Sequence, residues 1–279
     1  MRKITVEIMH SFKDYLISEE KAQATVDKYL YDVEAFQIWL GEAELCKIAV
    51  LDYKSYLCEH YAPASVNAAL SSLNSFFNFM EWYDLRVKNL RIQKQIFAST
   101  NKELTKAEYL RLLQAAKQKK NERLYLLMQT ICSTGIRVSE VRYVTVEAVS
   151  RGVAEINSKG KRRQVFLPKQ LCQILKQYIK AQKIKSGAVF VTRNGNPLDR
   201  SNIWSDMKKL CKAANVSDKK VFPHNLRHLF ARTYYSLQKD IVRLADILGH
   251  SNVNTTRIYT METGEIHRRQ IQKLGLLRC

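Results

Sequence analysis

Hydrophobic residues along most of the chain recur at three- and four-residue steps, the spacing that places them on one face of an α-helix. In the first hundred residues this pattern is bounded by residues that begin or end helices. Gly41 directly follows one apolar stripe, where it can cap a helix, and Pro63 opens another, where its missing N–H leaves no bond unmade. We therefore expect a block of four helices over residues 5–18, 21–41, 52–61 and 63–84.

One face of the helix expected over 63–84 is polar but carries no charge. It is formed by Asn67, Ser71, Asn74 and Asn78. Neutral amides and hydroxyls can lie against phosphates and base edges of DNA. The same face is also typical of an ordinary solvated helix, and the spacing alone favours that interpretation.

The apolar periodicity is lost over residues 86–100, and a clear helix start follows. Thr105 and Glu108 have the spacing of a capping box, flanked by Leu104 and Tyr109 as a hydrophobic staple. This break predicts two domains, residues 1–92 and 103–279, joined by a linker over 93–102.

The second part of the chain mixes helical patterns with three short β-like runs. Residues 153–157 and 164–167 are joined by Lys159-Gly160-Lys161 and predict a hairpin, while 143–146 is a further extended run. The remaining patterns predict helices over 105–117, 123–133, 168–181, 201–214, after Pro223, over 241–248, around Tyr259 and over the tail 262–279, with a new helix starting near Val138. The chain is thus expected to be mainly α.

The charge of the chain indicates a polyanionic partner. The net charge is +20, and it is unevenly placed. Residues 1–100 carry 11 basic and 13 acidic side chains, whereas the rest carries 35 and 13, a net charge of +22. Because so many like charges repel one another without a counter-ion, a nucleic acid is the expected partner, bound mainly by the second domain.

Other compositional features exclude several classes of protein. No apolar run approaches the ~18 residues of a membrane span, and the first residues lack the apolar region of a secretory signal, so a cytoplasmic protein is expected. The six cysteines are scattered without a C-x-x-C pair, which favours reduced thiols over disulfides or a zinc site. No glycine-rich phosphate loop is present, so no nucleotide cofactor is indicated.

Candidate chemistry gathers first in Pro223-His224-Asn225-Leu226-Arg227-His228. His224 and Arg227 are three residues apart and would share one helix face. His224 and His228 also have a zinc-binding spacing, but a metalloprotease would need glutamate at Asn225, and Arg227 brings positive charge. We therefore expect no metal, and interpret His228 as a buried, hydrogen-bonded side chain.

Four further residues are ambiguous when each is taken alone. Arg137 follows Thr134-Gly135 at a helix junction and is either an ion-pair partner or an anion ligand. Lys159 is either a solvated turn lysine or, together with Lys161, Arg162 and Arg163, part of a basic finger that could enter a groove. His250 directly follows Gly249. Tyr259 lies nine residues further on, on a segment expected to be helical, where a lone tyrosine usually packs on the apolar face.

Taken in order, these residues resemble the catalytic signature of the tyrosine recombinases, the lambda-integrase and Xer superfamily. The resemblance is carried by four short strings and one tyrosine: Thr-Gly-Ile-Arg-Val-Ser-Glu, Ser-Lys-Gly-Lys, the histidine–arginine string, Leu-Gly-His and Tyr259. It covers the whole chain. It implies an N-terminal four-helix core-binding (SAM-like) domain, whose polar face over 63–84 would contact DNA. It also implies a mostly helical catalytic domain with a small antiparallel β-sheet and a C-terminal tail helix.

The resemblance also implies a role for each candidate. Tyr259 attacks a phosphodiester and forms a 3′-phosphotyrosyl link, while Arg137 and Arg227 bind the scissile phosphate. Lys159 is the general acid, with Lys161 as the alternative. His224 takes or returns the tyrosine proton, and His250 donates a hydrogen bond to the phosphate. Arginine forks suit charge neutralisation at phosphorus, so neither a metal nor another cofactor is required.

The implied protein is a site-specific recombinase acting in integration, excision or dimer resolution. Its expected DNA partner is double-stranded and carries inverted half-sites. Four copies of the chain are expected to assemble on paired sites, held together by their C-terminal tails. Whether a partner recombinase also takes part is left open. The family often has threonine where Leu229 stands, and the start of the chain suggests a compact Xer-like member. The alternatives are a type IB topoisomerase-like nicking-closing enzyme, a non-catalytic DNA-binding protein, and a basic helical RNA-binding protein.

Overall fold

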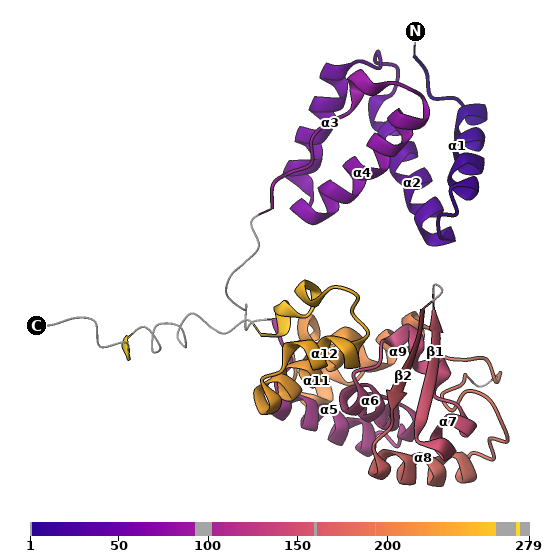
Figure 1. Ribbon diagram of the computed structural model, residues 1–279, viewed down its shortest axis with the longest axis vertical. Helices are drawn as coiled ribbons and strands as arrows, with labels where there is room; N and C mark the ends of the chain where they lie inside the picture. The colour runs from indigo at the N-terminus through magenta and orange to yellow at the C-terminus, as the bar shows by residue number, and fades with distance from the viewer. Residues whose placement is uncertain (1, 93–101, 159–160, 193, 261–271, 274–279) are drawn as a thin grey trace, which may run out of the picture. The chain divides into compact units, whose positions relative to one another are not determined.

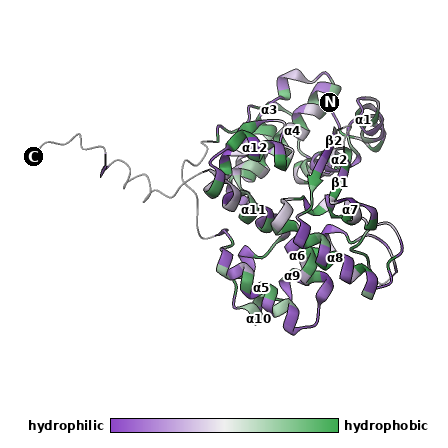
Figure 2. Cartoon of the chain, turned by 60° about the horizontal axis from the view of Figure 1, so that its bottom comes forward, coloured by the Kyte–Doolittle hydropathy of each residue, from purple (hydrophilic) through white to green (hydrophobic). Residues whose placement is uncertain are grey.

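The chain forms two compact units, Met1–Lys94 and Gln95–Cys279, in a computed structural model (Figure 1). The structure describes residues 2–92, 102–158, 161–192, 194–260 and 272–273. Most of these residues are helical, and each helix carries both hydrophobic and hydrophilic positions (Figure 2). None of the described helices is both long and apolar enough to cross a membrane.

Four helices build the first unit, as the sequence predicts. They are α1 (Val6–Ser18), α2 (Gln23–Leu40), α3 (Lys47–His60) and α4 (Pro63–Phe79). Their apolar faces meet around Phe12, Phe36 and Phe76, which are fully buried. The fourth helix is shorter than expected, because the chain turns through a left-handed conformation at Glu81 (φ +57°). A 3₁₀ turn, η1 (Tyr83–Leu85), follows.

The polar face of α4 binds the chain's own backbone. Asn74 donates from Nδ2 to the Val87 carbonyl (2.8 Å) and accepts the Val87 N–H at Oδ1 (2.9 Å). Asn67 makes the same pair of bonds with Leu90, at 3.0 and 2.7 Å. These amides satisfy the backbone of an extended segment much as a neighbouring strand would. In the DNA-free chain the amides of Asn67 and Asn74 are therefore engaged by backbone, whereas Asn78 is exposed, and contact of this face with DNA stays a prediction.

The second unit surrounds the buried helix α6 (Glu122–Thr134), which packs closely against α11 (Pro223–Gln238). The predicted capping box opens α5 (Lys106–Gln118), with Thr105 and Glu108 each bonded to the other's backbone N–H. The other helices of this unit are α7 (Val146–Arg151), α8 (Lys169–Ala181), α9 (Arg200–Lys208), α10 (Cys211–Ala214) and α12 (Ile241–Leu248), with 3₁₀ turns η3 (Val138–Tyr143), η4 (Asp218–Lys220), η5 (Val253–Thr255) and η6 (Arg257–Tyr259).

In the described part of the second unit, the β-sheet is a two-stranded antiparallel hairpin. The predicted hairpin is thus confirmed. Strand β1 (Val153–Ser158) pairs with β2 (Lys161–Phe166), with Val153 opposite Phe166 and Asn157 opposite Arg162. The hairpin lies next to α7, which in turn packs against α8 (Figure 1). Its two strands alternate between faces, so Ile156 and Val165 are buried while Phe166 is exposed.

Three expected elements differ in the structure. The run 143–146 is not a strand, because the Thr145 hydroxyl accepts the Ala148 N–H and starts α7. The helix expected over 201–214 is two helices, interrupted at Lys209 and Leu210. The helix expected around Tyr259 is replaced by the 3₁₀ turns η5 and η6. The tail helix over 262–279 lies, apart from residues 272–273, outside the described residues.

Candidate active site

Arg227 is the buried centre of the site. It lies on the second turn of α11, next to the core residue Leu226, and is 1% exposed. Its Nη1 donates to the Gly135 carbonyl (2.5 Å) and its Nη2 to the Leu248 carbonyl (2.7 Å). Burial, and then the positive charge of Arg137, lower the pKa of Arg227 to about 10. The guanidinium therefore stays charged near neutral pH, although its surroundings disfavour charge.

Arg137 is positioned from the end of α6. Gly135 ends that helix in a left-handed conformation (φ +66°), and η3 begins directly after Arg137. The side chain of Arg137 donates to Glu140 Oε1 (3.0 Å), and its backbone N–H donates to Glu140 Oε2 (3.0 Å). Burial alone would raise the pKa of Glu140, but these bonds and the charge of Arg163 lower it overall. A buried carboxylate thus holds the half-buried Arg137 in place.

Three arginines bind three successive carbonyl groups at the end of α12. Arg163 donates to Ile247 (2.9 Å), Arg227 to Leu248 (2.7 Å) and Arg137 to Gly249 (3.2 Å). The last carbonyls of a helix lack partners within it and form the negative end of its dipole, so cations are stabilising there. Side chains from α11, β2 and the α6–η3 junction therefore converge on the turn that precedes His250.

His250 and Tyr259 lie against this cluster. His250 has its Nε2 3.0 Å from Arg227 Nη2 and its Nδ1 2.8 Å from Thr256 Oγ1. Burial and the nearby arginines lower the pKa of His250 to about 4. Tyr259 is 4% exposed, and its ring is inclined by 17° to that of His250, with 6.2 Å between the centroids. The candidate nucleophile is therefore placed beside the candidate phosphate ligands.

The two histidines of α11 extend the site from Tyr259 to the surface. The ring of His228 meets Tyr259 edge-on (4.8 Å between centroids) and lies 4.5 Å from the ring of His224, which is exposed. Burial, then the charge of His224, lower the pKa of His228 to about 4. Its Nε2 is buried and has no partner in the part of the chain that the structure describes, so the expected hydrogen bond is missing at that atom.

Five of the six candidates are thus brought together. Desolvation, then the charges of Arg227 and Arg137, lower the pKa of His224. Lys159 lies outside the described residues, as does the side chain of Lys161.

Sequence reasoning missed Glu140 and Arg163 as parts of the site. The only signal for Glu140 was a carboxylate three residues after Arg137, and the only signal for Arg163 was its place in the basic finger. Among the described residues, no group of three His, Cys, Asp or Glu side chains is arranged to hold a metal.

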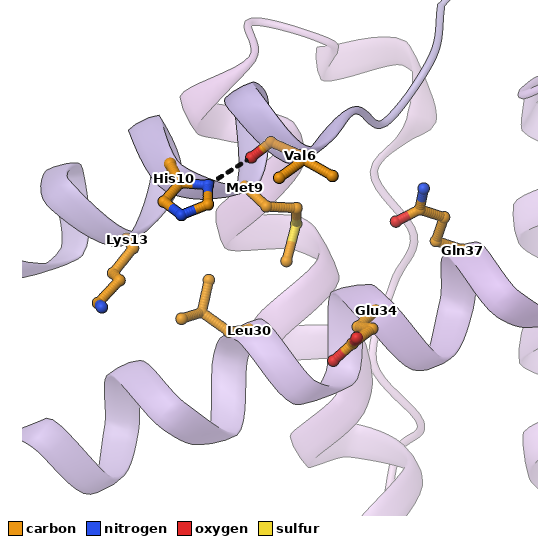
Figure 3. Close-up of a pocket in the computed structure, with 7 residues that line it drawn as sticks. All are labelled: Val6, Met9, His10, Lys13, Leu30, Glu34 and Gln37. Carbon is orange, nitrogen blue, oxygen red and sulfur yellow. Dashed lines mark hydrogen bonds between the residues drawn. The ribbon is translucent and has the colours of Figure 1, made fainter.

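A separate pocket in the first unit does not have this character. It lies between α1 and α2, where His10 Nδ1 is 2.8 Å from the carbonyl oxygen of Val6 (Figure 3). Its lining consists of Val6, Met9, His10, Lys13, Leu30, Glu34 and Gln37. No cluster of cations converges there, so we assign the candidate active site to the second unit.

Two family models match the chain in succession. The description "Phage integrase, N-terminal SAM-like domain" matches residues 9–83, and "Phage integrase family" matches residues 102–265. One relative over almost the whole length is tyrosine recombinase XerA of Thermococcus kodakarensis. It is 31% identical over 280 residues, which cover 97% of this chain and 96% of the relative.

Solved structures with the same fold include two DNA-acting proteins. A crystal structure of XerA recombinase is 26% identical, with a TM-score of 0.54, and the match covers 98% of this chain and 99% of that one. A lambda integrase tetramer bound to a Holliday junction is 19% identical, with a TM-score of 0.72, over 91% of this chain and 76% of that one. The second likeness is one of fold alone.

Proposed function

This chain belongs to the phage integrase family of tyrosine recombinases, and from that premise we propose that it cleaves and rejoins DNA through a 3′-phosphotyrosyl link to Tyr259. The protein is accordingly a site-specific DNA recombinase. The observation that carries the proposed site is the convergence of Arg137, Arg227 and His250 on one hydrogen-bonded turn, with Tyr259 packed against His250.

The proposed reaction consists of two exchanges at phosphorus. The hydroxyl oxygen of Tyr259 attacks the scissile phosphate, its proton passes to His224, and the 5′-oxygen leaves with a proton from Lys159. A 5′-hydroxyl of a second strand then attacks the phosphotyrosyl ester and releases Tyr259. One phosphodiester replaces another, so no external energy source is needed. Arg137 and Arg227 neutralise the charge that develops on the non-bridging oxygens.

The DNA-free arrangement implies rearrangement on binding. Both Nη atoms of Arg227 are bound to backbone carbonyls, and little of Tyr259 is exposed. A phosphate must therefore reach the N–H groups of Arg227 that these carbonyls leave free, among them the buried Nε, which has no partner among the described residues, and Tyr259 must move before its oxygen can attack. The lowered pKa of His224 keeps its imidazole neutral near pH 7, the form that accepts a proton.

Several features support the proposed DNA partner and assembly. The net charge of +22 beyond residue 100 suits a duplex polyanion, which we propose carries inverted half-sites. We propose a core-binding domain at 1–92, a linker at 93–102 and a catalytic domain at 103–279, acting in the cytoplasm as four copies on paired sites. A lambda integrase of this fold is a tetramer on a Holliday junction.

An apolar groove offers a place where the tail of a neighbouring copy could dock. The groove lies between α5, α6 and α11, and Leu237 in it is 74% exposed. Its lining consists of Lys106, Tyr109, Cys132, Leu229, Phe230, Thr233, Tyr234 and Leu237. Such an exposed apolar surface suits a helix that presents leucine and isoleucine side chains, which the tail contains.

The test is covalent capture of DNA. The purified protein is mixed with DNA from the flanks of its own gene, and a denaturing gel is inspected for a protein–DNA band. We expect the band with wild type and with Tyr235→Phe, a matched control packed against the same apolar cluster, but not with Tyr259→Phe. A band that survives in Tyr259→Phe would exclude this tyrosine. Recombinant products from two mapped sites, as opposed to relaxation alone, separate recombination from topoisomerase-like activity.

A further inference from the structure

Arg163 occupies a position that none of the proposed catalytic roles uses. It lies on β2, where its side chain is 16% exposed, while the neighbouring Arg162 is exposed on the other face. Its Nη1 donates to the Ile247 carbonyl (2.9 Å) and its Nη2 to Glu140 Oε2 (2.5 Å). Both terminal nitrogens are thus directed at protein acceptors.

These two bonds join the segments that carry the proposed phosphate ligands. Glu140 Oε2 also accepts the backbone N–H of Arg137, and Glu140 Oε1 accepts its side chain. The Ile247 carbonyl belongs to the turn whose next two carbonyls bind Arg227 and Arg137. Without Arg163, the buried Glu140 would lose its second cation, and the turn would lose its link to the β-hairpin.

The backbone of the turn is shaped to admit this side chain. Gly249 has a left-handed conformation (φ +65°), and a Cβ atom there would lie 2.4 Å from Cδ of Arg163. A lysine could not make the same connection, because one ammonium group cannot present two fixed donors to acceptors on opposite sides. The contact therefore requires both a glycine on the turn and an arginine on the strand.

We propose that Arg163 is a positioning residue: through Glu140 it fixes Arg137, and through Ile247 it fixes the turn that carries His250, so that both are in place when the scissile phosphate arrives. This inference rests on the proposed function. A misplacement of about 1 Å in such ligands can cost on the order of 100-fold in rate without loss of substrate binding.

The first test compares Arg163→Met with Arg162→Met. Both variants remove one positive charge from β2, but only the first breaks the network. Each full-length protein is tested on a duplex that contains the cleavage site mapped by covalent capture. We expect Arg163→Met to lower single-turnover cleavage by roughly 10- to 100-fold while half-site binding changes by less than about threefold. Arg162→Met should cleave bound DNA at the wild-type rate. A lysine at position 163 should not restore cleavage, so Arg163→Lys should be as slow as Arg163→Met.

A second readout separates positioning from a general structural effect. Replacing the scissile phosphate by a neutral methylphosphonate reduces the need for charge neutralisation by Arg137 and Arg227. We therefore expect the ratio of wild-type to Arg163→Met cleavage rates to shrink at least fivefold on this substrate. A sulfur at the 5′-bridging position, which leaves without a general acid, should leave the ratio unchanged.

Several results would overturn the proposal. Parallel losses of binding and cleavage, or equal rate ratios on phosphate and methylphosphonate, would reduce Arg163 to a structural residue. Recovery of Arg163→Met on the sulfur substrate would show that it acts through the general acid. Failure of the proposed function gives a different result, because wild-type protein would then form no covalent band or Tyr259→Phe would retain it.

Discussion

Arg227 Nη2 lies 3.0 Å from Nε2 of His250, and this contact defines the tautomer of His250 in the DNA-free protein. An arginine nitrogen can only donate, so Nε2 must accept and the imidazole proton must be on Nδ1. Nδ1 then donates to Thr256 Oγ1 at 2.8 Å. The role proposed for His250, donation to the phosphate, therefore requires that Nε2 gain a proton or that the ring change tautomer when DNA binds.

Thr256→Val tests this arrangement. Thr256 is fully buried, and valine preserves its shape but removes the acceptor of the His250 proton. We expect the free energy of unfolding to fall by about 1–3 kcal/mol, because the Nδ1–H is left unsatisfied. Cleavage should fall more than half-site binding. Thr255→Val, at an exposed neighbouring position, is the control in urea unfolding and single-turnover assays. Equal behaviour of the two variants would contradict the hydrogen bond between His250 and Thr256.

The lowered pKa values of His228 and His250 predict a stability that depends on pH. Both are lowered to about 4, whereas an unfolded histidine titrates near ~6.5. Between these values the unfolded chain binds protons that the folded chain does not, so the free energy of unfolding should fall as pH falls from ~6.5 to ~4. Urea unfolding at several pH values measures this slope.

His228→Gln is the variant for that experiment. It removes one of the two groups, so the slope of its free energy of unfolding between pH ~4 and ~6.5 should be shallower than that of wild type. An unchanged slope in His228→Gln would mean that His228 titrates alike in the folded and unfolded chain.

Local patterns sufficed where a local interaction decides the structure. The capping box at Thr105 and the proline at the start of α4 are complete within a few residues, and both were predicted. Thr145 is a counter-example: its hydroxyl starts α7, but the flanking valines suggested a strand. The segment around Tyr259 also escaped prediction, because Tyr259 packs with Ala231, Leu244 and Leu248 from other elements, and these contacts override helical spacing.

In the candidate site, too, residues that belong to a local string were predicted and residues with distant partners were not. The residues that we propose act on a phosphate belong to short strings and could be proposed from the sequence. The groups that hold them could not, because their partners are distant in the chain. Arg163 bonds Glu140 across 23 residues and Ile247 across 84. Similarly, Asn67 and Asn74 showed a regular polar face, but nothing local indicated that an extended backbone segment would cover it.

Gly249→Ala should impair both stability and cleavage. A left-handed alanine costs about 1–2 kcal/mol on its own, and the added Cβ would displace Arg163. Gly152→Ala is the matched control, because Gly152 is also left-handed (φ +76°) but has open space around the added atom. We expect Gly152→Ala to show the backbone cost with wild-type cleavage of bound DNA. Urea unfolding and the single-turnover assay distinguish the two variants, and identical results would argue against a tight contact with Arg163.

Asn74→Ala should loosen the segment that follows α4. The variant removes one donor and one acceptor for the backbone of Val87, each bond contributing about 0.5–1.5 kcal/mol. Hydrogen exchange at the Val87 amide, which donates to Asn74, should therefore become roughly tenfold faster. Asn78→Ala changes the same type of residue one turn further along α4, at an exposed position, and should leave that exchange unchanged. If Val87 keeps its protection in Asn74→Ala, the side-chain amide of Asn74 does not hold the segment.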